Sequence, residues 1–516
     1  MGNSHWAYKI ADRLAMKHRG SKIVCASGIS PSGPIHIGNL REVMTTELVY
    51  RALQQKGIDS EFIFSWDDFD KFRKIPIGSP KSLENSIGKP YSSIDDPFGE
   101  YESYAERFEV KFEESLSQLG INPRFIRQTE MYKSGEYDLQ IKEILNKRSQ
   151  IAEILARNMT QGMTEEQKKN YFPIVLYSRF TGKDNTKVLS YDGDSKLTYL
   201  CHDSGKKDTI DFTKDRVIKL PWKIDWPMRW VFESVNFEPG GADHASPGSS
   251  YDVSSQIVKE IFENSPPHFQ EYQFVRIKGQ AGKMSSSSGN VITPGELLNV
   301  YPPELIKFLY ARCSPTAPLD IALDKDVIRA FAEFDSDVEG WEEGFRKLIT
   351  EKTKSELSRS IPFRKIFGLG EATGYNLEII KDLLRSEGGE FSDFSIEDRL
   401  KKSDYWSRTH FSEGRSELRD SPNTSHLSLM SADAREKIRS LEKKVLSQDG
   451  LTLDEIELEI YSIPKREGMS DQEKKIAQRS FFKDVYQLLF GKNNGPRLPT
   501  YFWSSKDKDR IRRLLG

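Results

Sequence analysis

The sequence has few cysteines and no long hydrophobic run. Its only three cysteines among 516 residues are Cys25, Cys201 and Cys313, which are odd in number and too far apart for a disulfide framework. No apolar run approaches the roughly 18 residues that a membrane-spanning helix needs. The first residues lack the apolar core of a signal peptide, and Trp6 stands where a myristoylation signal has Ser or Thr. These absences predict a soluble protein of the reducing cytoplasm, without a membrane partner.

The chain also lacks an excess of charge of either sign. Its 76 Lys and Arg residues and 78 Asp and Glu residues leave a formal net charge of −2. This does not exclude a nucleic-acid partner, because one face of a neutral protein can still be basic. A chain of this length exceeds one ordinary hydrophobic core, so about two to four domains are expected.

The first 70 residues predict one half of a nucleotide-binding fold. Residues 21–30 are typical of a buried strand, residues 38–57 of a helix that ends at Gly57, and residues 60–68 of a second strand. The turn "PSGPIHIGNL", residues 31–40, lies between the first strand and the helix. Such residues expose backbone N–H groups at a helix start, which favours an anion site. A strand, a Gly-rich turn, a helix and a strand form one half of a doubly wound sheet.

The predicted secondary structure changes twice along the rest of the chain. Helices are predicted at 104–120 and 135–158, short strands at 165–218 and one strand at 271–279. From about 325 onward strand signals almost vanish, and charged amphipathic helices follow, for example at 326–349, 431–447 and 472–490. This change of composition predicts a domain boundary near residues 320–330.

A second stretch, "KGQAGKMSSSSGN" at residues 278–290, matches the anion site of the first turn in chemistry. It has several glycines, one central lysine, Lys283, and four serines that can surround phosphates. Either stretch alone is a weak signal, since a Ser/Gly loop is usually a surface loop and a His beside a Gly is usually structural. Their occurrence together, one after the first strand and one after a late strand, favours a nucleotide site.

The two stretches resemble the HIGH and KMSKS signatures of the class I aminoacyl-tRNA synthetases. Asn39 replaces the last His of the first signature, and Ser286 replaces the second Lys of the other. Three longer stretches, "ASGISPSGPIHIGNLREV", "LPWKIDWPMRWVFESVNFEPGGADH" and "IKGQAGKMSSSSGN", are similar to the class I lysyl-tRNA synthetases. The likeness runs from His5 to about residue 320 and extends more diffusely into the helical remainder.

The resemblance implies an α/β fold with two parts. A class I Rossmann-type parallel sheet would form a catalytic domain over residues 1–320, with an inserted acceptor-end subdomain at about 130–220. An all-α anticodon-binding domain would follow over residues 325–516. The implied activity is ATP-dependent activation of L-lysine and its transfer to tRNA(Lys), with Mg²⁺ accompanying ATP. No DNA partner is expected, and a monomer is predicted.

The implied chemistry agrees with the residues at hand. The lysine carboxylate is ionised at pH 7, so its attack on the α-phosphorus of ATP needs no general base. The reaction needs positioning and stabilisation of phosphate charge. We therefore predict the catalytic residues His36, Asn39 and Lys283. The predicted ATP contacts are Pro31, His36, Gly38, Asn39, Lys283, Met284, Ser285, Ser286 and Ser287, and the predicted lysine contacts, which the resemblance implies, are Gly28, Ser30, Trp222, Asp243, His244 and Tyr272.

Other residues near these motifs have plainer interpretations. Trp226 and Trp230 are expected to pack in the core, and Asp225 and Arg229 to form a structural pair across one helical turn. The acidic run Asp67, Asp68 and Asp70 predicts a solvated loop end, with one carboxylate that could face the substrate ammonium.

The insertion raises the question of zinc. Related enzymes often have two cysteine pairs in this part, at about residues 171–207. Here Val175 and Ser178 stand in place of the first pair, and Cys201 with Ser204 in place of the second. One thiol and a nearby His202 cannot make a closed four-ligand site, so we expect no structural zinc.

Three alternatives remain at this stage. A glutamyl- or glutaminyl-tRNA synthetase shares the general plan, although the tryptophan segment and the Ser-rich loop favour lysine. A synthetase paralogue that binds RNA without charging it would not need both nucleotide motifs. A nucleotidyltransferase of small metabolites with a similar turn would not need the long helical remainder.

Overall fold

The computed structural model describes residues 5–279 and 291–516. The chain divides into two compact units, one formed by Met1–Ile321 with Trp341–Glu351 and the other by Ala322–Gly340 with Lys352–Gly516. The short return to the first unit has a packing reason: Trp341 stacks on Phe308 with ring centroids 5.4 Å apart, and the Tyr8 hydroxyl donates to the Gly344 carbonyl at 2.9 Å. Among the described residues no helix is long and apolar enough to cross a membrane.

A five-stranded parallel sheet forms the centre of the first unit. Its strands lie in the order β10-β9-β1-β2-β3. Their bounds are β1 Ile23–Ile29, β2 Ser60–Trp66, β3 Arg124–Arg127, β9 Val235–Gly241 and β10 His268–Tyr272. The chain first adds strands on one side of β1 and later on the other, so the order reverses between β1 and β9. In such sheets the crevice for ligands opens at this reversal, outside the carboxyl ends of the strands.

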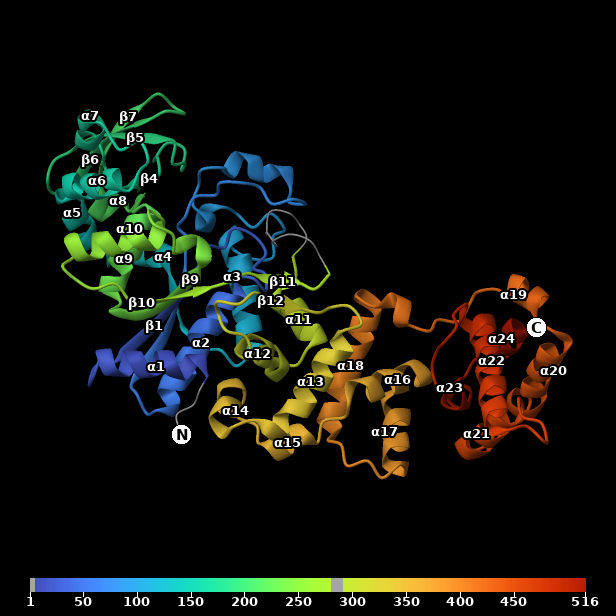
Figure 1. The fold of residues 1–516 in the computed structure, drawn as a ribbon. Helices are drawn as coiled ribbons and strands as arrows, with labels where there is room; N and C mark the ends of the chain where they lie inside the picture. The colour runs from blue at the N-terminus through green and yellow to red at the C-terminus, as the bar shows by residue number, and fades with distance from the viewer. Residues whose placement is uncertain (1–4, 280–290) are drawn as a thin grey trace. The chain divides into compact units, whose positions relative to one another are not determined.

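Helices cover both faces of this sheet, as Figure 1 shows. On one face lie α1 (Trp6–Lys17), α2 (Leu40–Gln55) and α3 (Tyr104–Gln118), and on the other α9 (Trp222–Phe232) and α10 (Ser250–Glu260). The alternation of strand side chains explains this: Phe64 of β2 meets Phe112 of α3, while Val24 and Ala26 of β1 share a core cluster with Trp226 and Val258. Burial on both faces is why β1, at the centre of the sheet, has no charged residue and is buried along almost its whole length.

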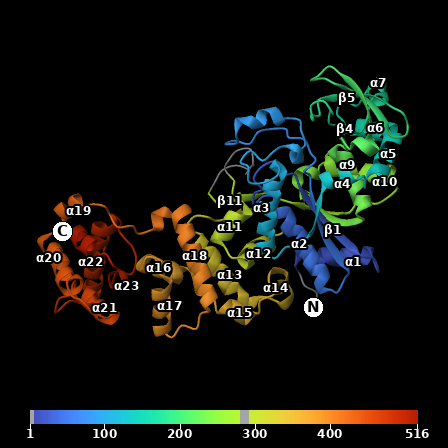
Figure 2. The same ribbon diagram turned by 180° about the vertical axis from the view of Figure 1, so that it is seen from behind.

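The insertion between β3 and α9 packs against α9 and α10 through one shared hydrophobic core. Figure 2 shows its helices and short strands gathered beside α9 and α10. They are α4 Gln128–Ser134, α5 Asp138–Asn146, α6 Arg148–Arg157, α7 Glu165–Lys169, β4 Val175–Leu176, β5 Thr186–Tyr191, β6 Lys196–Cys201, β7 Lys207–Asp211, α8 Phe212–Asp215 and β8 Ile218–Lys219. The single helix predicted at 135–158 is wrong: two helices meet at Lys147, whose ammonium is anchored on the Ile261 carbonyl at 2.6 Å.

The strand predicted at 271–279 is also two strands in different sheets. Tyr272 ends β10 opposite Gly241, whereas β11 (Val275–Ile277) pairs with β12 (Leu319–Ile321). Between them the Gln273 N–H donates to the Pro315 carbonyl, which moves the chain from one sheet to the other. Two further helices, α11 (Pro294–Val300) and α12 (Pro303–Ala311), precede β12, and the 3₁₀ turns of this unit are η1 Lys81–Ser86, η2 Tyr91–Ser93 and η3 Ala242–His244.

The described residues of the second unit form helices and loops and no strand. The single helix predicted at 326–349 is divided into α13 (Val327–Asp337), η5 (Val338–Gly340) and α14 (Glu343–Ile349). The helices are α13 Val327–Asp337, η5 Val338–Gly340, α15 Lys354–Ser358, α16 Phe363–Thr373, α17 Leu377–Ser386, α18 Asp393–Thr409, η6 Ser412–Gly414, α19 Thr424–Leu429, α20 Ala432–Leu441, η7 Glu442–Leu446, α21 Leu453–Ser462, α22 Asp471–Phe490, α23 Leu498–Ser504 and α24 Lys508–Leu515. The segment Glu343–Ile349, α14, belongs to the first unit. Phe331, Phe363 and Trp406 form one aromatic core, and α19 to α24 enclose another. The predicted fold class, an α/β part followed by an all-α part, is confirmed.

Candidate functional site

A cavity of about 480 Å³ opens at the reversal of strand order in the first unit. The carboxyl ends of β1, β2, β9 and β10 and the start of α2 and α9 supply its walls. The lining residues are Gly28, Ile29, Ser30, Ser32, Asn39, Glu42, Asp67, Asp70, Arg73, Tyr91, Trp222, Trp226, Glu238, Pro239, Gly240, His244 and Tyr272. The predicted lysine contacts Gly28, Ser30, Trp222, His244 and Tyr272 therefore meet in one cavity, although they come from four distant segments.

Backbone hydrogen bonds fix the turn between β1 and α2. The His36 N–H donates to Asn39 Oδ1 at 3.3 Å, and the Gly38 N–H donates to His36 Nδ1 at 3.0 Å. Ile37 is held from both sides, because its N–H donates to the Ile292 carbonyl and its own carbonyl accepts from the Tyr310 hydroxyl. Since Nδ1 of His36 accepts a hydrogen bond, the neutral ring has its proton on Nε2. The turn thus presents a neutral N–H donor at the N-terminus of α2, where the helix dipole favours anions.

Gly38 is required by the packing of the turn. A Cβ atom at this position would lie 2.7 Å from both Cε1 and Nδ1 of the His36 ring, which is closer than non-bonded carbon and ring atoms approach. Any larger residue must therefore move the imidazole. The predicted contacts Lys283, Met284, Ser285, Ser286 and Ser287 lie outside the described residues. The predicted contacts Pro31, His36 and Gly38 lie in this turn but do not line the 480 Å³ cavity.

Glu42 lies in the first turn of α2, three residues beyond Asn39. Its carboxylate accepts hydrogen bonds from the Gly28 N–H at 2.9 Å and from the Tyr272 hydroxyl at 2.8 Å. Enclosure by the protein raises the pKa of Glu42 to about 8, which these two donors only partly oppose, and Glu238 adds to the rise. Among the described residues no ion pair is found for Glu42, so a cation bound in the cavity would supply its missing counter-charge.

Glu238 is a second buried carboxylate of the cavity, from the middle of β9. It is 8% exposed and accepts from the Trp230 indole N–H at 2.6 Å. Burial raises the pKa of Glu238 to about 7. Two enclosed carboxylates with raised pKa values on one cavity wall indicate a site for a positively charged ligand.

The prediction that Asp67, Asp68 and Asp70 form a solvated loop end is wrong for the first two. Asp67 and Asp68 are 6% and 4% exposed. Asp67 lies 2.9 Å from Arg229 and Asp70 pairs with Lys219, while Asp68 accepts from the backbone N–H of Thr129. The two cations come from the end of the insertion and from α9, so their proximity could not be read from the acidic run itself.

Helix α9 brings the tryptophan segment to the cavity. Trp222 stacks on Trp226 with centroids 4.8 Å apart, and the Arg229 guanidinium lies over the Trp222 ring at 5.1 Å. Pro227 within the helix cannot donate to the Lys223 carbonyl, and the Ser254 hydroxyl of α10 donates there instead at 3.1 Å. Trp226 and Trp230 are buried in the core as expected, and Trp226 also lines the cavity.

The sequence did not single out Glu42, Glu238, Arg73, Tyr91 or Gly240 for this site, and Asp243 does not line it. Asp243 is exposed on the turn after β9. Glu238 had a readable signal, because a charged residue in an otherwise buried strand needs a special reason. Glu42 had none, since an acidic residue in the first turn of a helix is normally explained by the helix dipole.

Cys201 is the one cysteine of the insertion. This thiol is buried at the end of β6. Burial raises its pKa, but hydrogen bonds from Ser178 and Ser204 outweigh burial and lower the pKa to about 7. In the part of the chain that the structure describes, no group of three or more His, Cys, Asp or Glu side chains could hold a metal.

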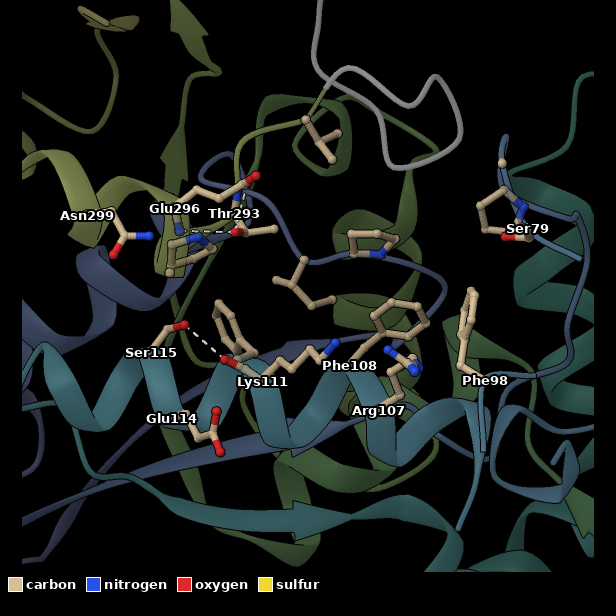
Figure 3. A pocket seen from close by; sticks show the side chains of 18 of the residues that line it. Ser79, Phe98, Arg107, Phe108, Lys111, Glu114, Ser115, Thr293, Glu296 and Asn299 are labelled. Carbon is tan, nitrogen blue, oxygen red and sulfur yellow. Dashed lines mark hydrogen bonds between the residues drawn. The ribbon is translucent and has the colours of Figure 1, made fainter. Parts of the chain in front are cut away.

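A second cavity of about 780 Å³ lies on another side of the same turn, against Pro34 and Ile35. Figure 3 shows Lys111 of α3 pointing toward Phe108, while the Glu296 side chain lies at Thr293, where Glu296 accepts from the Thr293 N–H at 2.8 Å. None of the predicted contacts among the described residues lines this larger cavity. Its acidic groups do not converge as those of the smaller cavity do, so the smaller one is the candidate amino-acid site.

Known proteins are similar to this chain over most of its length. The family model described as tRNA synthetases class I (K) matches residues 4–361. A lysine–tRNA ligase of Pyrococcus horikoshii is 35% identical over 99% of this chain and 99% of its own. A lysine–tRNA ligase of Borreliella burgdorferi is 35% identical over 96% of each chain, and one of Streptomyces coelicolor is 33% identical over 99% of this chain and 98% of its own. The chain therefore belongs to the family of class I (K) tRNA synthetases.

Proposed function

We propose that this protein activates L-lysine with ATP to lysyl-adenylate and transfers the lysyl group to tRNA(Lys). The observation that carries the proposal is the cavity at the strand reversal, whose wall holds Glu42 and Glu238. Within residues 5–279 and 291–516 no cation pairs with Glu42. Such a wall suits a substrate with ammonium groups. It opposes the glutamyl alternative, because a substrate carboxylate would meet carboxylates there.

We assign the two ammonium groups of lysine to different carboxylates. The ε-ammonium would pair with the Glu42 carboxylate, which accepts from the Tyr272 hydroxyl, while the Trp222 ring would contact the aliphatic stem. The α-ammonium would lie at Asp67, whose charge Arg229 offsets only in part. This arrangement leaves the α-carboxylate for the side of Asn39, at the start of α2.

Activation would then proceed at the turn before α2. The lysine carboxylate attacks the α-phosphorus, a carboxylate–phosphorus bond forms, and the bond to the leaving pyrophosphate breaks. His36 through Nε2–H, Asn39 and the N-terminus of α2 would stabilise the phosphate charge, and Lys283 would add a fixed positive charge. Mg²⁺ held by the ATP phosphates would neutralise part of that charge.

The remaining assignments complete the proposal. The second unit would contact the anticodon of tRNA(Lys), and the insertion its acceptor end. The protein would act in the cytoplasm as a monomer. The non-charging paralogue is disfavoured because hydrogen bonds within the turn before α2 hold the side chains of His36 and Asn39 in place.

The amino-acid specificity is the direct test. Charging of unfractionated tRNA should succeed with lysine and fail with norleucine, glutamine and glutamate, because polar partners left unpaired in an enclosed site can cost about 10⁴–10⁵ in discrimination. Trp222→Ala and His244→Ala should raise the KM for lysine more than that for ATP. Preferred charging of glutamate, or variants that disturb ATP alone, would refute the lysyl assignment.

Lysine binding should release protons from the cavity. Free Glu42 and Glu238 have pKa values near 8 and 7, and a bound ammonium lowers them, so roughly one proton should leave near pH 7. Affinity should therefore fall as the pH is lowered through this range. Calorimetry in buffers of different ionisation enthalpy measures the release, and Glu42→Gln should reduce it. An unchanged release in that variant would contradict the role of Glu42.

Gly38→Ala tests the placement of His36. The new methyl group must displace the imidazole, so the activation rate should drop by ~10²-fold or more, with lysine affinity nearly unchanged. Activation is measured with tRNA present. Gly368→Ala is the matched control, since a Cβ there meets nothing within 4 Å. Equal activity of the two variants would argue against a placed His36.

The protein should contain no structural zinc. Only Cys201 offers a thiolate in the segment around β4 to β7, and its hydrogen bonds come from Ser178, Ser204 and the Asp203 backbone. Elemental analysis should find well below one zinc per chain. Stoichiometric zinc that survives mild chelation would show that the ligand set lies elsewhere.

A further inference from the structure

Five charged side chains form a continuous row behind one wall of the 480 Å³ cavity. In order they are Asp70, Lys219, Asp225, Arg229 and Asp67, which we call the buried charge ladder. Lys219 Nζ pairs with Asp70 and lies 3.3 Å from Asp225 Oδ2, while Arg229 lies 3.0 Å from Asp225 Oδ2 and 2.9 Å from Asp67 Oδ1. Only the two ends, Asp70 and Asp67, line the cavity.

The middle of the ladder is closed to solvent. Asp225 is 0% exposed, Lys219 2% and Arg229 7%. Three carboxylates and two cations leave one negative charge, which the two cavity-lining ends present to the ligand. Lysine at neutral pH carries two ammonium groups and one carboxylate, and thus one positive charge.

The ladder contacts depend on charge more than on directed hydrogen bonds. Within the described residues, Asp67 Oδ1 and Asp225 Oδ2 accept no hydrogen bond of good geometry. Arg229 is nevertheless close to both oxygens, and Lys219 is close to Asp225 Oδ2. The other oxygen of Asp225 accepts from the Tyr132 hydroxyl, and Arg229 donates to the Ser65 hydroxyl at 2.8 Å. These two bonds fix the positions of Asp225 and Arg229 within the ladder.

We propose that Asp225 and Lys219, which do not line the cavity, are specificity-determining residues that set the charge the cavity presents to lysine. They act through Arg229, Asp67 and Asp70, and are positioning residues, not catalytic ones. The inference rests on the proposed binding of lysine. It goes further by making substrate affinity depend on the net charge of the ladder.

Two single variants of the full-length protein change that net charge in opposite directions, and their combination restores it. Asp225→Asn makes the ladder neutral and retains an acceptor for Tyr132, so lysine should bind about tenfold more weakly or worse. Lys219→Met leaves two negative charges, and lysine should bind more tightly than in the original protein. The double variant Asp225→Asn with Lys219→Met restores one negative charge and should recover most of the lost affinity.

The measurement is equilibrium binding of L-lysine at low ionic strength, with thermal unfolding followed for each variant. Binding of MgATP should stay constant throughout. Asp96→Asn is the matched control: it removes another buried acid of the same unit, paired with Arg107, and should lower stability without changing lysine affinity.

Each result decides between charge and general damage. If all three variants weaken lysine binding, or if the double variant is the weakest, the ladder does not act through its charge. Because the single changes have opposite signs, either one decides the matter when the other fails to fold. If the original protein does not bind lysine, the proposed function falls and the inference with it, whereas lysine binding that is equal in all variants overturns the inference alone.

Discussion

Carboxylates gathered around an enclosed cavity are the constraint on which the rest of this site depends. Glu42, Glu238 and Asp67 lie at one cavity, each with a raised pKa because burial penalises its ionised form. Only nearby cations or hydrogen-bond donors can keep such groups charged. Arg229 and Lys219 supply part of that charge from behind the wall, and a cationic ligand would supply the remainder.

The parallel sheet makes this gathering possible. Because β1, β2, β9 and β10 all end on the same edge, residues far apart in the chain meet at the reversal of strand order. Helix α2 begins at this edge, so its N-terminus and the turn around His36 lie beside the acidic wall of the cavity. The start of α2, where the helix dipole favours anions, and the buried carboxylates of the cavity therefore lie at the same edge of the sheet.

The buried charges also connect the insertion to the central sheet. Lys219 ends the insertion, Arg229 lies in α9, and both reach the acidic residues after β2. Burying ions is costly unless they are paired, so the insertion, α9 and β2 must keep their relative positions for the cavity to exist. The Tyr132 hydroxyl, which bonds both Asp225 and the Leu220 N–H, ties α4 to the same row.

The sequence by itself determined the fold class, the first strand–helix–strand unit and the turn at His36, because apolar periodicity and turn chemistry are local properties. It also indicated Trp222, His244 and Tyr272, through a resemblance. It could not determine where a helix divides at Lys147 or where one strand passes to another sheet at Gln273, since contacts with Ile261 and Pro315 decide these. Tertiary structure alone decided that Asp67 is buried against Arg229 and that Glu42 meets Tyr272. Charge pairing between distant segments depends on distance in space, which no local pattern encodes.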